Sequence, residues 1–359
     1  MALLADATVR SVVLVRARTG LGDLLCTVPA LRALRARLPD AHIALLSYAE
    51  MRPVVDRMRA WVDELLPFPG WPGIPERPVD VRALAPFLAA VRERRFDLAV
   101  QMYGGNPAAN EVTERLGAAR TAGFLVPGTA APDPAGHMAY PHGRHEIDRH
   151  LDLMALLGAP STGAALEFPI EPRDESEAAA VRADAGLGSG PYALLHPGAT
   201  SPSRRWPVER WARVADALAA RGLTVGVTGV PSERDAASAV CRRMRSPSAN
   251  LCERTTLGGF AALLRGAALL AGNDSGPAHL AAAVGVPSVV VFLSGDPVRW
   301  AHPGAQHRVA RADVGCNPCP HLSCPIDHRC AARVTVPAVV AEVDAALAAR
   351  SSRLPATAQ

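Results

Sequence analysis

One stretch constrains the fold of this chain more than any other. Residues 269–293 read LLAGNDSGPAHLAAAVGVPSVVVFL and pass from an apolar run, through a polar turn, to a helix-forming segment and a second apolar run. Ser275 stands where a helix cap is favoured, Pro277 lies just inside the helix, and Gly285 closes it. The pattern predicts a βαβ unit whose turn lies at the carboxyl edge of a sheet, where open α/β folds bind ligands.

The turn of this unit has the chemistry of a site for a phosphate and a sugar. Free backbone N–H groups at the start of a helix favour a phosphate. Asp274 would repel a phosphate, but its carboxylate suits the hydroxyl groups of a sugar. A sugar next to a phosphate indicates a nucleotide sugar as the ligand.

Strands and helices alternate along the whole chain, which predicts an α/β fold. Phe168–Arg173 contains two prolines and is expected to link two halves. We therefore predict two Rossmann-like domains facing across a cleft, at residues 1–172 and 173–335, with a C-terminal helix and tail at 336–359. The predicted strands are Val9–Arg16, Ile43–Tyr48, Leu98–Gln101, Thr121–Phe124, Tyr192–His196 and Leu223–Thr228, and the predicted helices are Val81–Arg94, Asn110–Leu116, Ile147–Leu157, Val208–Ala220 and Val336–Ala349.

Three local features qualify this pattern. Pro29 should kink the first long helix or delay its start. Residues 125–147 are rich in Pro, Gly and His and are expected to form a functional or mobile loop. The last ten or so residues are expected to be disordered.

Composition excludes several classes of function. A net charge of +4 is small for 359 residues, so we expect no nucleic-acid partner. No apolar run reaches the ~18 residues of a membrane span, and Asp6 and Arg10 do not fit a signal peptide. We expect a cytoplasmic protein. Because the chain contains no Lys, any role that commonly uses Lys falls to Arg.

The N-terminal glycines invite a dinucleotide-binding reading that fails on inspection. Gly20-Leu21-Gly22 follows the first strand, but the sixth position of the GxGxxG pattern is Leu25. The match is too weak, and we reject it.

Four motifs occur in a specific order: Gly22-Asp23-Leu24 with Thr27–Leu31, HPGA at 196–199, Arg204–Pro207 and GNDSGPAHLAAAVGVPSVVVF. Together they resemble glycosyltransferase family nine, the heptosyltransferases that add ADP-heptose to the lipopolysaccharide core. The resemblance runs from about residue 10 to 340 and implies the GT-B fold, with an N-terminal acceptor domain and a C-terminal donor domain. It also implies an inverting, metal-independent transfer that needs no cofactor.

The resemblance assigns the catalytic base to Asp23, which would take the proton of the attacking acceptor hydroxyl. The alternative is a purely structural role, in which Asp23 caps the helix after Gly22. Arg204 matches a family Lys that contacts the donor pyrophosphate, and a leaving diphosphate without a metal needs such a charge. Arg204 could instead be a solvated surface residue. Thr200 and Ser201, in the same loop, would add hydroxyl contacts to phosphate.

Other donor contacts follow from the same resemblance. Glu233 matches an acidic residue that binds the ribose, although a first turn of helix also favours Glu there. Asp274 would lie near the donor sugar, with Ser275 and Gly276 at the helix start. His279, one turn beyond, is as easily a packed structural residue as a ligand, and His196 orients the phosphate loop or simply packs.

The acceptor side is less defined. Gln101, Asn106 and Arg144 are the predicted acceptor-binding residues, and the basic side chains of the 125–147 loop would either meet an anionic acceptor or stay solvated. The acceptor is left open among a glycan, a lipid-linked molecule that would bring the chain to a membrane surface, and a small natural product. The donor is expected to be ADP-heptose, but another nucleotide or a hexose fits the sequence as well.

Four cysteines cluster near the C-terminus with the spacing C-x2-C-x4-C-x5-C. Cys316, Cys319, Cys324 and Cys330 could hold a structural zinc ion or iron–sulfur cluster, pair as disulfides, or stay free thiols. Two further functions stay open for the chain as a whole. One is a nucleotide-sugar epimerase on the same fold, and the other is a non-enzymatic nucleotide-sugar-binding module.

Overall fold

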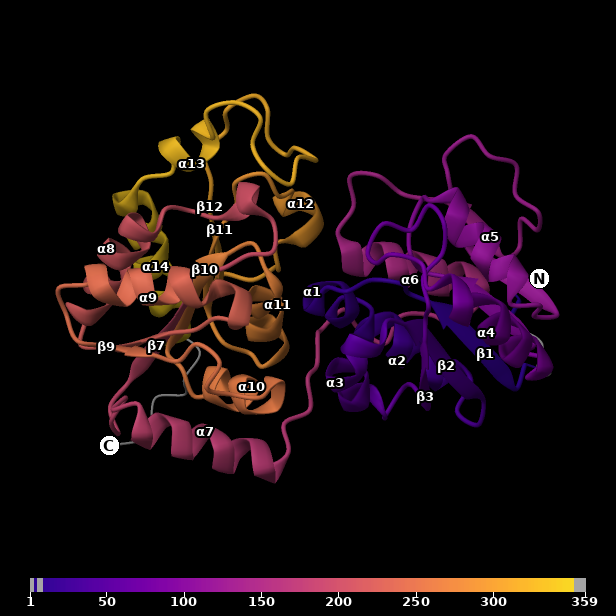
Figure 1. Ribbon diagram of the computed structural model, residues 1–359, viewed down its shortest axis with the longest axis horizontal. Coiled ribbons are helices and arrows are strands. Elements are labelled where there is room, and N and C mark those ends of the chain that lie inside the picture. Colours follow the sequence, from indigo (N-terminus) through magenta and orange to yellow (C-terminus); the bar gives the residue numbers. More distant parts are fainter. Residues whose placement is uncertain (1–2, 5–8, 352–359) are drawn as a thin grey trace. The chain divides into compact units, whose positions relative to one another are not determined.

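The computed structural model describes residues 3–4 and 9–351 and divides into two compact units, Met1–Glu167 and Phe168–Gln359 (Figure 1). The predicted linker therefore starts at the first residue of the second unit. Asp6 and the tail from residue 352, on which two of the expectations above rest, lie outside the described residues.

The first unit is built on a six-stranded sheet in the order β3-β2-β1-β4-β5-β6, and every neighbouring pair is parallel. Its strands are β1 (Ser11–Val15), β2 (His42–Ser47), β3 (Glu64–Pro67), β4 (Leu98–Gln101), β5 (Arg120–Leu125) and β6 (His137–Ala139). Its helices are α1 (Leu21–Leu25), α2 (Val28–Arg37), α3 (Arg52–Val55), α4 (Val81–Glu93), α5 (Pro107–Arg115) and α6 (Glu146–Leu157).

The second unit has another six-stranded parallel sheet, in the order β12-β11-β10-β7-β8-β9. Its strands are β7 (Tyr192–His196), β8 (Thr224–Val227), β9 (Ser248–Asn250), β10 (Leu269–Asn273), β11 (Ser288–Val291) and β12 (His307–Ala310). Its helices are α7 (Pro172–Asp184), α8 (Val208–Ala219), α9 (Arg234–Arg243), α10 (Leu257–Arg265), α11 (Gly276–Ala283), α12 (Pro297–Trp300), α13 (Arg329–Arg333) and α14 (Val336–Ser351), with the short 3-10 turns η3 (Pro202–Arg204) and η4 (Pro231–Glu233).

Both sheets have the same topology. When the strands of each unit are counted from its own first strand, both orders read 3-2-1-4-5-6, the doubly wound Rossmann arrangement. Strand order reverses between β1 and β4 in the first unit and between β7 and β10 in the second. Ligands of such sheets bind outside the carboxyl ends of the strands at this switch point.

The central strands form because their residues are apolar on both faces, as parallel sheets covered by helices require. All five residues of β7 and of β10 are buried. The helices cover the sheet with one apolar stripe. In α8, Trp211, Val214, Ala215 and Leu218 follow helical spacing and are buried in the second unit's core.

The structure confirms two local predictions and corrects a third. Pro29 lies in the first turn of α2, so the helical segment after β1 starts as a short α1 and restarts at Val28, the predicted delay. The 125–147 segment is not wholly a loop, because β6 pairs with β5 within it. The predicted C-terminal helix is present as α14 and packs against β11, β12 and α8. None of the described helices has both the length and the apolar character needed to cross a membrane.

Candidate active site

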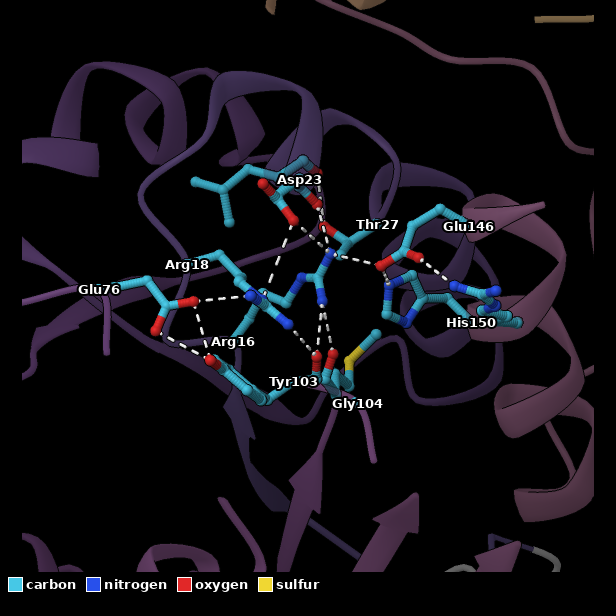
Figure 2. A network of polar contacts seen from close by, with 12 residues as sticks. Arg16, Arg18, Asp23, Thr27, Glu76, Tyr103, Gly104, Glu146 and His150 are labelled. Carbon is cyan, nitrogen blue, oxygen red and sulfur yellow. Dashed lines mark hydrogen bonds and ion pairs between the residues drawn. The ribbon is translucent and has the colours of Figure 1, made fainter. Parts of the chain in front are cut away.

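Arg16 organises the switch point of the first unit. It follows β1, is fully buried, and donates from Nη1 to the carbonyl of Met102 beyond β4 at 2.8 Å. Its Nη2 donates to the carbonyl of Asp23 at 3.0 Å, so one guanidinium joins the ends of both strands to α1 (Figure 2).

Asp23 presents its carboxylate beside two arginines. It lies in the first turn of α1 with its side chain 25% exposed, and Oδ1 is 3.5 Å from Nη2 of Arg16 and 4.0 Å from Nε of Arg18. Gly20 is the N-cap of α1, and no side chain caps the helix. The alternative that Asp23 serves as the cap is therefore wrong, and its role as a base stays a prediction.

Arg16 also pairs with a buried carboxylate, that of Glu146. Glu146, at the start of α6, lies 3.0 Å from Arg16 Nη2 through Oε1 and 3.0 Å from Arg149 Nη1 through Oε2. His150 Nε2 is 3.5 Å from the same carboxylate. Because these groups are almost fully buried, breaking one pair would leave a charge without compensation, so the network fixes the position of Arg16.

Three further residues beside Asp23 were missed by the sequence analysis. Arg18 pairs with Glu76 at 2.6 Å and lies 3.8 Å above the ring of Tyr103, whose hydroxyl donates to Glu76 at 2.8 Å. Burial and Glu76 raise the pKa of Tyr103 to about 12, so its hydroxyl stays a donor. The positions of Arg18 and Tyr103 just after strands β1 and β4 could have indicated them; Glu76, in a stretch without periodicity, gave no signal.

The predicted acceptor residues have structural partners instead. Gln101 is buried, and its Nε2 donates to the carbonyls of Gly104 and Phe124 and to Asn110 Oδ1. These bonds use both hydrogens of its amide group. Asn106 caps α5. Arg144 is half-exposed and paired with Asp152 at 2.8 Å. Polar groups that end a buried strand or begin a helix need local partners, and this explains these residues without an acceptor.

In the second unit, Asn273 joins the two strand ends at the switch point. Its Nδ2 donates to the carbonyl of Pro197 after β7 at 2.7 Å, and its Oδ1 accepts from the backbone N–H of Trp206 at 3.1 Å. The next residue, Asp274, is buried and lies 3.3 Å from Arg204 Nη1. Arg204 is 36% exposed at this pair, so the alternative of a purely solvated residue is wrong.

Glu233 lies against the loop that follows β7. Its Oε2 is 3.2 Å from His196 Nε2 and accepts from the backbone N–H of Val230 at 3.0 Å. Burial would raise the pKa of Glu233, but the hydrogen bond and charge of His196, the Val230 N–H and Arg205 outweigh burial and lower it. A Cβ on Gly198 would overlap this carboxylate, so any side chain there would displace it.

Helix α11 starts beside Asp274. Ser275 is at the predicted N-cap but makes no capping bond; its hydroxyl donates to the carbonyl of Asn273 instead. Pro277 has no N–H and that of Ala278 donates to the Ser275 carbonyl at 3.1 Å, so Ser275 and Gly276 provide the N–H groups that start the helix. His279, one turn on, is buried, has Nδ1 2.9 Å from His302 Nε2, and lines a small cavity with Asp274.

The remaining predicted donor residues, Thr200 and Ser201, lie in the loop between β7 and η3. Thr200 is exposed and Ser201 half-buried, directly before η3. The structure thus brings Arg204, Asp274 and the start of α11 together, with His196, Gly198 and Glu233 after the neighbouring strands of the same sheet.

The four clustered cysteines are free thiols in the structure. Within residues 3–4 and 9–351, no three His, Cys, Asp or Glu side chains are grouped to hold a metal ion. The predicted metal-ligand arrangement is therefore not assembled. Cys316 is exposed, whereas Cys330 packs into the apolar core of the second unit, which accounts for its burial without a metal.

Comparisons with known proteins agree with this geometry. The family model of glycosyltransferase family 9 (heptosyltransferase) matches residues 86–329. Lipopolysaccharide heptosyltransferase 3 of Escherichia coli K12 is 25% identical over 301 residues, covering 78% of this chain and 81% of its own.

Solved structures show the same fold. The E. coli ADP-heptose lps heptosyltransferase II superposes with a TM-score of 0.71 at 20% identity, over 94% of this chain and 99% of that one. The iron-containing dodecameric glycosyltransferase TibC of enterotoxigenic E. coli superposes with a TM-score of 0.56 at 15% identity, over 96% and 77%. The GT-B expectation for the fold is confirmed.

Proposed function

Since this chain belongs to glycosyltransferase family 9, we propose that it transfers a heptose from ADP-heptose to a hydroxyl group of an acceptor, with inversion at the anomeric carbon. The observation that carries the proposal is the convergence of Arg204, Asp274 and the start of α11 at the carboxyl edge of one sheet. That group offers a cation and free N–H donors for a diphosphate and a carboxylate for sugar hydroxyls.

The donor is held by the second unit. Arg204 and the first N–H groups of α11 contact the diphosphate, and Asp274 accepts from a hydroxyl of the sugar. Both contacts to the Glu233 carboxylate use Oε2, which leaves Oε1 to accept from the ribose hydroxyls. Thr200 and Ser201 add hydroxyl contacts from the loop.

The chemical step belongs to Asp23. The acceptor oxygen attacks the anomeric carbon from the side opposite the diphosphate, and its proton passes to the Asp23 carboxylate. The bond from the anomeric carbon to the diphosphate breaks as the new glycosidic bond forms. Negative charge develops on the leaving diphosphate, and Arg204 stabilises it.

Acceptor recognition falls to the residues beside the base. Arg18, Glu76 and Tyr103 lie next to Asp23 and offer both donors and acceptors to a polyhydroxyl molecule. They replace Gln101, Asn106 and Arg144 as the proposed acceptor contacts. Both arginines near Asp23 already face a second carboxylate, which favours an acceptor without a phosphate next to the attacking hydroxyl.

The transfer is proposed to need no metal ion, because Arg204 supplies the charge that the leaving group requires. The name of TibC describes an iron-containing protein. The described residues do not bring the four cysteines together as metal ligands, and no step of the transfer is assigned to a metal there.

The test combines donor binding and product formation. Calorimetry with ADP-, UDP- and GDP-sugars should show preference for the ADP-sugar, and Asp23→Asn should keep that affinity while transfer falls about 10²–10⁴-fold. EDTA should leave wild-type transfer unchanged. Preference for a UDP- or GDP-sugar would overturn the donor, full turnover in Asp23→Asn would overturn the base, and a sugar epimer without transfer would show an epimerase.

A further inference from the structure

We propose that Ser203 is a positioning residue for the donor site: it fixes Arg204 by fastening the η3 turn to the cysteine-bearing loop. The inference rests on the proposed role of Arg204 as the diphosphate contact. Ser203 precedes Arg204 in the chain and is 2% exposed, so it cannot touch a ligand itself.

All the polar groups of Ser203 bond to residues far along the chain. Its backbone N–H donates to the carbonyl of Leu322 at 2.9 Å, and its carbonyl accepts from His328 Nε2 at 3.0 Å. Its hydroxyl donates to the carbonyl of His321 at 2.6 Å. A single residue thus holds the 321–328 segment through three separate atoms.

Ser203 also makes a fourth hydrogen bond, between its hydroxyl and that of Ser294, and the donor in this pair can be identified. A hydroxyl has one hydrogen, and a carbonyl can only accept, so the Ser203 hydrogen belongs to His321. Ser294, whose Oγ lies 2.9 Å from Ser203 Oγ, is therefore the donor in that pair. The backbone carbonyl of Ser294 accepts in turn from Cys319 at 2.9 Å, which ties the cysteine loop to the segment after β11.

The segment after β11 also supports the partner of Arg204. Gly295 lies against the Asp274 carboxylate, where a Cβ would overlap Oδ2. Ser294 and Gly295 are consecutive, so the same turn fastens the arginine through Ser203 and makes room for the aspartate. The geometry of the Arg204–Asp274 pair is set by this turn.

The η3 turn is anchored on both sides of Arg204. Ser203 anchors the chain just before Arg204. Just after it, the backbone N–H of Trp206 donates to Asn273 Oδ1 at 3.1 Å. Trp206 is buried and packs edge-on against Trp211. With both flanks fixed, the Arg204 side chain projects from a defined backbone position, which lowers the entropy lost when it orders on a diphosphate.

The test is a double-mutant cycle on ADP affinity, measured by calorimetry with the full chain. Ser203→Ala should weaken ADP binding about tenfold, and Arg204→Ala about tenfold or more. In the Arg204→Ala background the added Ser203→Ala change should cost less than about twofold, because there is no arginine left to position.

Tyr192→Phe is the matched control. It also removes one buried hydroxyl of the second unit, which donates to Leu263, but at the amino end of β7. It should lower the unfolding temperature and leave ADP affinity unchanged. If Ser203→Ala does not fold, Ser294→Ala carries the cycle, with an expected loss of about threefold that also disappears without Arg204.

The outcomes separate the two proposals. Equal losses with and without Arg204, or a folded Ser203→Ala with wild-type affinity, overturn the positioning role while the proposed function stands. If ADP does not bind, the cycle is run with whichever of UDP, GDP, CDP and dTDP does. If none of these nucleoside diphosphates binds, the proposed function fails and this inference fails with it.

Discussion

At the scale of single residues, the site is governed by carboxylates whose partners are fixed. Asp23 has Arg16 and Arg18, Asp274 has Arg204, and Glu233 has His196. In each case one carboxylate oxygen meets the partner and the side chain stays at the carboxyl edge of a sheet. The arrangement holds each carboxylate in a defined orientation without a ligand.

The ionisation of Glu233 makes the free energy of unfolding depend on pH. Its pKa in the folded protein is lowered, so its ionised form stabilises the fold above the ordinary value of 4.5, and that contribution is lost as pH falls through the lowered value. We expect Glu233→Gln to be less stable than wild type by about 1.5–3 kcal/mol at pH 7, the range for a hydrogen bond to a charged group.

Denaturant unfolding of both proteins between pH 7 and pH 3 measures this difference. The two unfolding free energies should converge as the pH drops below 4.5. A difference that stays constant over the range would show that the carboxylate charge contributes nothing to the fold.

At the scale of elements, the loops that follow β7 and β8 are fitted to each other. Gly198 in the first loop faces Glu233 in the second, and a Cβ added to Gly198 would lie only 2.1 Å from the Glu233 carboxyl carbon. A side chain at residue 198 would therefore displace the Glu233 carboxylate, and glycine avoids this overlap.

We predict that Gly198→Ala displaces the Glu233 carboxylate. The variant should lose about 1–3 kcal/mol of stability, the usual cost of overpacking, and should bind ADP about tenfold more weakly. Gly190→Ala is the matched control, because a Cβ there meets nothing within 4 Å. It should stay within about 0.5 kcal/mol of wild type. Equal ADP affinity in both variants would contradict the fit between the loops.

The same scale shows which parts of the structure can be predicted from sequence. β4 and β7 have the predicted bounds, because central parallel strands are unbroken apolar runs. β3, β9 and β12 were missed because they lie toward the sheet margins, where polar residues dilute the pattern. The local partners of Gln101 could not be predicted, because a polar residue that ends a buried strand bonds to backbone groups that sequence does not reveal.

Site residues follow a similar rule. Asp23, Arg204 and Asp274 were placed by motifs that keep fixed positions after strands. Glu76 and Ser203 act through partners that only the folded chain brings near, so neither a spacing nor a composition could indicate them.

At the scale of the whole molecule, the two units have separate cores, one around β1 and β4 and the other around β7 and β10. We expect calorimetric unfolding to show two transitions, of which ADP raises only that of the second unit. Saturation at 100 times the dissociation constant should stabilise it by about 2.7 kcal/mol.

Two variants test which transition belongs to which unit. Leu34→Ala opens a cavity in the first unit and should lower that unit's transition alone. Arg204→Ala should abolish most of the shift caused by ADP. A single transition that ADP moves as a whole would show instead that the units unfold together.

The wholly parallel pairing of both sheets has a kinetic consequence. Parallel neighbours cannot be joined by a tight hairpin, so each pairing must wait for a crossover to close. Chains dominated by such distant pairings fold slowly, and their unfinished edges stay open to other copies meanwhile. Recovery of this protein from denaturant should therefore be best in dilute solution, where an open strand edge meets its own chain before it meets another.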